Sequence, residues 1–144
     1  MKFWQSFSKK QIKKQLFFGI ALFALMIPLA IRDSNTQVKV NFDDAAISIR
    51  SDRYNMSVRY DQIAYAELAE LVDPGEKVED AYDDNVLRVG AWYNDTWGEY
   101  YITADPDTDN CVVMHLDDGR IFVFSCKNDD KTAKLYEELL TYLN

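Results

Sequence analysis

Three aspartates alternate along the segment DPDTDN, as Asp105, Asp107 and Asp109. Carboxylates at the first, third and fifth positions begin the calcium loop of an EF-hand, in which oxygen ligands surround the cation. The rest of that pattern is missing, because Asn110 stands where glycine is needed and Leu116 stands where a bidentate glutamate is needed. We therefore expect a solvated turn between strands, with neither a metal site nor a cofactor.

His115 is the only histidine of the chain. It has no second histidine or cysteine pair beside it, and the chain has no serine motif of the G-x-S-x-G type. The five glycines form neither a P-loop nor a dinucleotide-binding pattern. These absences predict a protein that is not an enzyme; an enzyme whose site is assembled only by the fold remains as an alternative.

Aromatic residues gather around a probable turn at residues 94–96. The candidate binding residues are Trp92, Tyr93, Trp97 and Tyr100. Aromatic rings on opposing strands stabilise sheets, which is one interpretation of this cluster. The other is that the rings form an exposed face for a peptide or protein, because such side chains bury a large area at a small entropic cost.

An uncharged, mostly apolar run occupies residues 16–31 and predicts a transmembrane helix over residues 15–32. At 1.5 Å per residue such a helix is about 24–26 Å long, which is short for a membrane span. A cleavable signal peptide is the alternative, but cleavage after Ala30 or Ser34 would place Pro28 or Arg32 where a small residue is required. We therefore expect a single-pass anchor in the cell membrane.

The orientation of this anchor follows from its flanks. Residues 1–14 carry five lysines, whereas the residues just after the span offer only Arg32 and Lys39. The more basic flank of a span stays in the cytoplasm. We therefore expect a cytoplasmic basic tail over residues 1–14, a linker over residues 33–36, and an extracytoplasmic domain over residues 37–144.

The charge of the outer part is strongly negative. Residues 32–144 contain 11 basic and all 24 acidic residues, so their formal net charge is −13. Nucleic acids and anionic lipids are usually bound by clustered lysine and arginine, so we expect neither as a specific ligand. A protein partner fits this charge better, and the oligomeric state is left open.

The domain reads mainly as short strands. Runs rich in Val, Ile, Tyr and Phe alternate with turn residues, and Asp118-Gly119 marks a hairpin. Residues 129–143 change to helical spacing. A two-residue turn at Asp118-Gly119 would place Cys111 opposite Cys126, whereas a three-residue turn with a bulge would separate them; we expect free thiols.

The order of these segments resembles the bacterial pleckstrin-homology-like domain of Firmicute membrane proteins. The most specific pieces are YDQI at residues 60–63, RVGAWYNDTWGEY at residues 88–100, and the Asp-Gly hairpin that leads into the final helix. The resemblance implies a mainly β member of the α+β class: a transmembrane helix, then a bent antiparallel β-barrel of about seven strands, capped by a C-terminal α-helix. It also implies a strand over residues 63–71, where AYAELAELV by itself favours a helix.

Together these patterns predict a non-enzymatic, membrane-anchored binding or scaffolding module that engages protein partners outside the cytoplasm. The alternative is an acidic inhibitor or immunity-type protein directed against a basic secreted enzyme or toxin, since charge complementarity would favour that contact.

Overall fold

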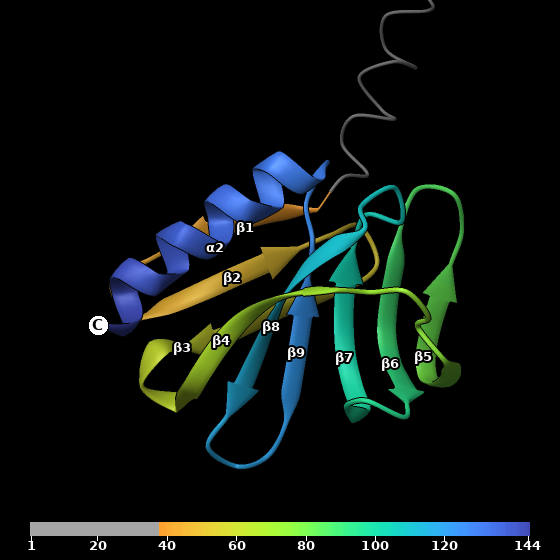
Figure 1. Ribbon diagram of the computed structural model, residues 1–144, viewed down its shortest axis with the longest axis horizontal. Coiled ribbons are helices and arrows are strands. Elements are labelled where there is room, and N and C mark those ends of the chain that lie inside the picture. Colours follow the sequence, from red (N-terminus) through yellow and green to blue (C-terminus); the bar gives the residue numbers. More distant parts are fainter. Residues whose placement is uncertain (1–37) are drawn as a thin grey trace, which may run out of the picture. The chain divides into compact units, whose positions relative to one another are not determined.

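The computed structural model describes residues 38–144 (Figure 1). The predicted tail (1–14), span (15–32) and linker (33–36) lie outside them. No helix in the described part of the chain has the length and apolarity needed to cross a membrane. The elements are β1 (Lys39–Phe42), β2 (Ala46–Arg50), β3 (Asn55–Arg59), a 3-10 turn (Tyr60–Gln62), β4 (Ile63–Glu70), β5 (Glu76–Asp83), β6 (Arg88–Asn94), β7 (Gly98–Ala104), β8 (Asn110–Leu116), β9 (Ile121–Phe124) and α2 (Asp129–Leu143).

The strands form two separate sheets. Strands β1, β2 and β3 make an antiparallel meander, and the other six strands make a sheet in the order β4-β8-β9-β7-β6-β5. Strand β9 lies between β8 and β7, antiparallel to β8 and parallel to β7. The hairpin turns that follow β6 and β8 lie at the same end of this sheet (Figure 1).

The prediction of a β-barrel of about seven strands is wrong, because the nine strands belong to two sheets and neither sheet closes. Closure of the larger sheet would require its edge strands, β4 and β5, to pair. The backbone of strand β5 is too irregular for such pairing. The β5–β6 register shifts between Lys77 and Glu79 and again between Glu79 and Tyr82, and Asp80 has a φ of +50°. Bulges and edge charges of this kind block the addition of another strand.

A first apolar cluster fills the space between the two sheets and the helix. Strand β2 contributes Ile47 and Ile49, and both are fully buried. Helix α2 packs against β8 and β4 and closes the cluster with Leu135 and Leu139. The helix begins after Asn128, whose side chain accepts a hydrogen bond from the backbone N–H of Lys131, as an N-cap residue does.

A second apolar cluster lies on the opposite face of the six-stranded sheet. Its buried members include Trp92, Tyr100, Cys111 and residues of β7, β8 and β9. The connection between β4 and β5 crosses this face (Figure 1), and Leu71 of that connection packs against the cluster. The hydroxyl of Tyr100 donates a hydrogen bond of 2.6 Å to the carbonyl of Pro74, which fastens the connection to β7.

Residues 63–70 form strand β4, although their local propensity favours a helix. The strand pairs along its length with β8, so that Tyr65, Glu67 and Ala69 lie opposite His115, Val113 and Cys111. Cross-strand pairing and burial on β8 outweigh a propensity difference of a few tenths of a kcal/mol per residue. The implied strand is therefore confirmed.

The two cysteines are free thiols, as predicted. In the β8–β9 hairpin His115 pairs with Ile121 and Val112 pairs with Phe124, which is the register of a three-residue turn with Gly119 at a φ of +89°. Cys126 therefore does not lie opposite Cys111. The two thiols belong to different apolar clusters, so a disulfide between them would require the hairpin to be rebuilt.

Candidate binding site at the β6–β7 hairpin

The β6–β7 hairpin is held by a short polar turn. The side-chain oxygen of Asn94 accepts hydrogen bonds from the backbone N–H groups of Thr96 (3.1 Å) and Trp97 (2.7 Å). Gly98 then adopts a φ of +73°, a conformation that glycine reaches without strain. The turn places Tyr93 directly opposite Glu99 across the hairpin.

Two of the four predicted binding residues lie in the second apolar cluster. Trp92 is 3 % exposed and its indole N–H donates to the carbonyl of Val89 at 3.1 Å, while Tyr100 is fully buried. Trp97 is half-buried and meets the ring of Tyr100 edge to face, with centroids 5.2 Å apart. These contacts stabilise the sheet, and they leave little of Trp92 or Tyr100 for a partner.

Tyr93 points to the other face of the sheet, beyond the last buried residues of β6 on that face. Along this face of β6, Val89 is 2 % exposed, Ala91 is 6 % exposed and Tyr93 is 47 % exposed. The first two residues lie in the interior, whereas the ring of Tyr93 meets solvent. An amphipathic ring held on a rigid strand in this way is typical of protein-binding surfaces.

Carboxylates flank Tyr93 on both sides. Glu76 of β5 and Glu99 of β7 are its direct cross-strand neighbours, and both are exposed. A hollow of about 440 Å³ lies at this end of β5 and β6, and it is lined by Asp73, Gly75, Glu76, Tyr93, Asn94, Asp95 and Thr96. We call this hollow, together with Glu99, the Tyr93 site.

No basic side chain lines the hollow of the Tyr93 site. Lys77, which follows Glu76 in the chain, lies on the other face of the sheet, with its ammonium 5.8 Å from the ring centre of Trp92. Among residues 38–144, none of the site's four carboxylates takes part in a salt bridge. The Tyr93 site therefore carries uncompensated negative charge around an aromatic ring.

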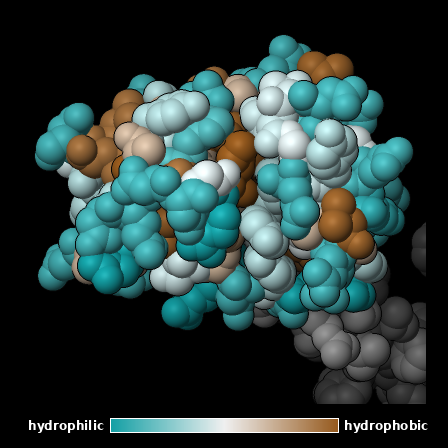
Figure 2. Space-filling view, turned by 90° about the horizontal axis from the view of Figure 1, so that it is seen from below, coloured by the Kyte–Doolittle hydropathy of each residue, from teal (hydrophilic) through white to brown (hydrophobic). Residues whose placement is uncertain are grey.

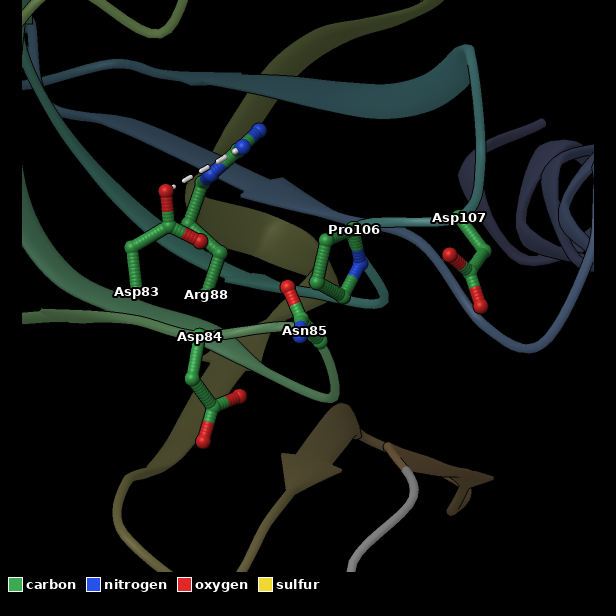
Figure 3. Close-up of a pocket in the computed structure, with 6 residues that line it drawn as sticks. All are labelled: Asp83, Asp84, Asn85, Arg88, Pro106 and Asp107. Atoms are coloured by element: carbon green, nitrogen blue, oxygen red, sulfur yellow. Dashed lines mark hydrogen bonds and ion pairs between the residues drawn. The ribbon is translucent and has the colours of Figure 1, made fainter.

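A second hollow, of about 430 Å³, lies where β5 ends (Figure 3). Arg88 pairs with Asp83 there at 3.3 Å between Nη2 and Oδ2. The neighbouring Asp84 accepts hydrogen bonds from the Tyr82 hydroxyl and from the N–H groups of Val86 and Leu87, which lower the pKa of its carboxyl. The carboxylates of Asp83 and Asp84 are thus engaged within the chain, whereas the buried Nε of Arg88 has no hydrogen-bond partner among the described residues.

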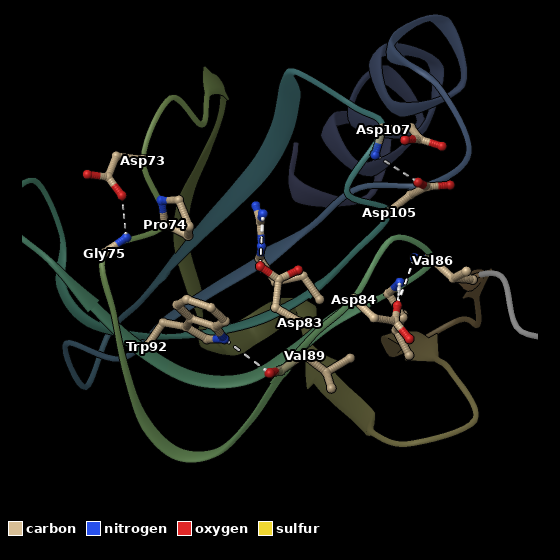
Figure 4. A network of polar contacts seen from close by, with 12 residues as sticks. Asp73, Pro74, Gly75, Asp83, Asp84, Val86, Val89, Trp92, Asp105 and Asp107 are labelled. Atoms are coloured by element: carbon tan, nitrogen blue, oxygen red, sulfur yellow. Dashed lines mark hydrogen bonds and ion pairs between the residues drawn. The ribbon is translucent and has the colours of Figure 1, made fainter.

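The aspartate-rich segment forms the predicted turn between β7 and β8 (Figure 4). A side-chain oxygen of Asp105 accepts the N–H of Asp107 at 3.0 Å, and burial raises the pKa of the Asp105 carboxyl. Asp129 at the start of α2 accepts the N–H groups of Asp109 and Asn110. Within residues 38–144 no group of three or more side chains is arranged to hold a metal ion, and these aspartates serve the turn.

The histidine and the two cysteines, which could act as a base or as nucleophiles, lie outside the Tyr93 site. His115 stacks on Tyr65 and lies 3.0 Å from Glu67, measured from Nε2 to Oε1. Burial, with a smaller contribution from Glu67, raises the pKa of the Cys111 thiol to about 12, and burial also raises the pKa of Cys126. A thiol with a raised pKa is a poor nucleophile at neutral pH.

The acidic half of the Tyr93 site was not predicted from the sequence. The sequence patterns indicated no strand within the acidic residues 73–85, but residues 76–83 form β5 and bring Glu76 next to Tyr93. Strand propensity gave no signal there, because aspartate and glutamate are depleted in strands. The turn predicted at residues 94–96 would have paired Tyr93 with Trp97, whereas the observed register pairs Tyr93 with Glu99.

Comparison with known proteins finds no family model, curated protein or solved structure that matches this chain. The resemblance to the pleckstrin-homology-like family thus stays a prediction, and the function has to be argued from the site.

Proposed function

We propose that this protein is a non-enzymatic binding module, anchored in the membrane by residues 15–32, that engages a protein partner outside the cytoplasm through the Tyr93 site. The observation that carries the proposal is the exposed ring of Tyr93, held on a paired strand beside a hollow of about 440 Å³. Of the four binding residues predicted from the sequence, Tyr93 belongs to this site, and the half-buried Trp97 packs on Tyr100 in the second apolar cluster. Trp92 and Tyr100 support the sheet beneath them.

The location of the site on the domain agrees with a role in binding. Figure 2 looks at the end that carries the β6–β7 and β8–β9 turns, and its surface is mainly hydrophilic with apolar side chains in small separate groups. Strand β1, the first element of the described chain, begins at the opposite end of the domain from these turns (Figure 1). The carbonyl of the preceding Val38 accepts a hydrogen bond from the thiol of Cys126, just beyond β9. The hairpin end that carries Tyr93 is therefore remote from the point at which the described chain begins.

The alternative function, an acidic inhibitor or immunity-type protein against a basic secreted enzyme or toxin, is favoured by the same uncompensated carboxylates. Both functions use the Tyr93 site, and they differ in what happens to the partner. A scaffold leaves the partner active, whereas an inhibitor covers its active site.

Site-specific photo-crosslinking tests the proposal. A photoreactive phenylalanine analogue replaces Tyr93 in the full-length chain, in its native membrane, and irradiation is followed by purification and mass spectrometry. The matched control carries the same analogue at Tyr65, which is 55 % exposed on a different face. We expect a discrete crosslinked protein from position 93 only. Equal or absent crosslinking at both positions would refute the proposal, and loss of the partner's activity on binding would select the inhibitor.

A further inference from the structure

We infer that the partner presents a lysine- or arginine-rich segment, one of whose cationic side chains lies on the ring of Tyr93 between Glu76 and Glu99; this inference rests on the proposed function. The register sets the geometry. Glu76 and Glu99 stand on the strands on either side of β6, so their Cα atoms are roughly 10 Å apart with the ring between them. A cation above the ring centre would meet a carboxylate on each side.

The chemistry of the site selects a cation over other ligands. Carboxylates repel acidic segments and phosphates, and the hollow offers no basic group to offset that repulsion. A purely apolar segment would leave Glu76 and Glu99 partly desolvated without partners, which costs free energy. Lysine and arginine satisfy both features, since they bind aromatic faces through cation–π contact and carboxylates through charge-assisted hydrogen bonds.

Two further carboxylates extend the surface beyond a single side chain. Asp73 and Asp95 line the hollow next to Tyr93. The Asp73 carboxylate accepts one hydrogen bond, from the N–H of Gly75 at 2.8 Å, which holds it in place and leaves its second oxygen free of intramolecular partners among the described residues. The occupant is therefore a segment with more than one positive charge.

Strand addition to β5 is not part of this binding mode. Although β5 is an edge strand, its two register shifts and the positive φ of Asp80 interrupt the row of backbone groups that an added strand would need. The partner would therefore bind through side chains across the sheet face, and its affinity would be sensitive to charge and salt.

The test measures binding of a capped hexa-arginine peptide, labelled with a neutral dye, to the full-length chain in a neutral detergent by fluorescence anisotropy. The double variant Glu76→Gln/Glu99→Gln removes the flanking charges. The matched control Glu137→Gln/Glu138→Gln removes the same charge from exposed positions of α2. Tyr93→Ala removes the ring, and Tyr93→Phe keeps an aromatic face.

We expect Glu76→Gln/Glu99→Gln to weaken binding about fivefold and the α2 control to weaken it less than about twofold. Tyr93→Ala should weaken binding about threefold, while Tyr93→Phe should retain it. All four variants change exposed side chains, so circular dichroism and thermal unfolding should match the parent chain.

Equal weakening by the two double variants would overturn the inference, because the peptide would then respond to overall charge and not to this site. Unchanged binding by Tyr93→Ala would overturn it as well. If the peptide result is negative while position 93 still crosslinks a protein partner, the inference fails and the proposed function stands. If position 93 crosslinks no partner, the proposed function itself fails.

Discussion

Replacing Tyr100 by phenylalanine tests how the second apolar cluster is closed. Tyr100 is fully buried in β7, and its hydroxyl is the hydrogen-bond donor to Pro74 in the β4–β5 connection, at 2.6 Å. Phenylalanine keeps the ring and removes only that bond. An intramolecular hydrogen bond contributes about 0.5–1.5 kcal/mol net, and the partly exposed Pro74 can recover some hydration. We therefore expect Tyr100→Phe to lower the free energy of unfolding by about 1 kcal/mol.

The same variant should also change how the free energy of unfolding depends on pH in alkaline solution. Burial raises the pKa of Tyr100 to about 12 from its ordinary value of 10.0. A raised pKa means that between pH 10 and pH 12 the folded state holds a proton that the unfolded state has lost, so the free energy of unfolding falls as the pH rises through this window. At pH 11 the contribution of Tyr100 to this fall is about 1 kcal/mol, and Tyr100→Phe should remove it.

The assay is urea unfolding of the full-length chain in neutral detergent, followed by tryptophan fluorescence at pH 8 and pH 11. At pH 8 the loss of about 1 kcal/mol should appear in the free energy of unfolding extrapolated to zero urea. Tyr93→Phe is the matched control, because it removes a hydroxyl from an exposed ring. If Tyr100→Phe is as stable as the control at pH 8, or loses as much stability as the parent chain at pH 11, the Tyr100 hydroxyl does not fasten the connection.

Three further outcomes follow from buried groups and backbone geometry. Trp92→Ala should lower the free energy of unfolding by about 3–5 kcal/mol, measured by urea titration, because it empties a site that is 3 % exposed; a loss below about 1 kcal/mol would contradict its burial. Gly75→Ala should cost more than about 1 kcal/mol, since Gly75 has a φ of +84° and an added Cβ would lie 1.9 Å from the carbonyl oxygen of Tyr93; an unchanged thermal melt would contradict this. Cys111 and Cys126 should resist a thiol reagent at pH 8 in the folded chain and both react in denaturant, because both are buried with raised pKa values; rapid modification without denaturant would refute that expectation.

The sequence predicted most strand segments because side-chain type reports local preference. Val, Ile, Tyr and Phe mark β2, β6, β7, β8 and β9, and the periodicity over residues 129–143 matches the bounds of α2. The Asp118-Gly119 turn was also readable, although its three-residue form was only one of two open alternatives. Strand β5 was not predicted because half of its eight residues are acidic, and only its pairing with β6 holds it extended.

The sequence alone determined local conformational preferences and the total charge. These are the turn residues, the period of the helix, and a formal charge of −13 after residue 31. The tertiary structure decided how the strands divide into two sheets, because register and the bulges of β5 depend on neighbours far apart in the chain. It also decided the site. The neighbouring residues Trp92 and Tyr93 lie on opposite faces of the sheet because side chains alternate along a strand. Only the positions of the covering elements bury Trp92 and leave Tyr93 in solvent between Glu76 and Glu99.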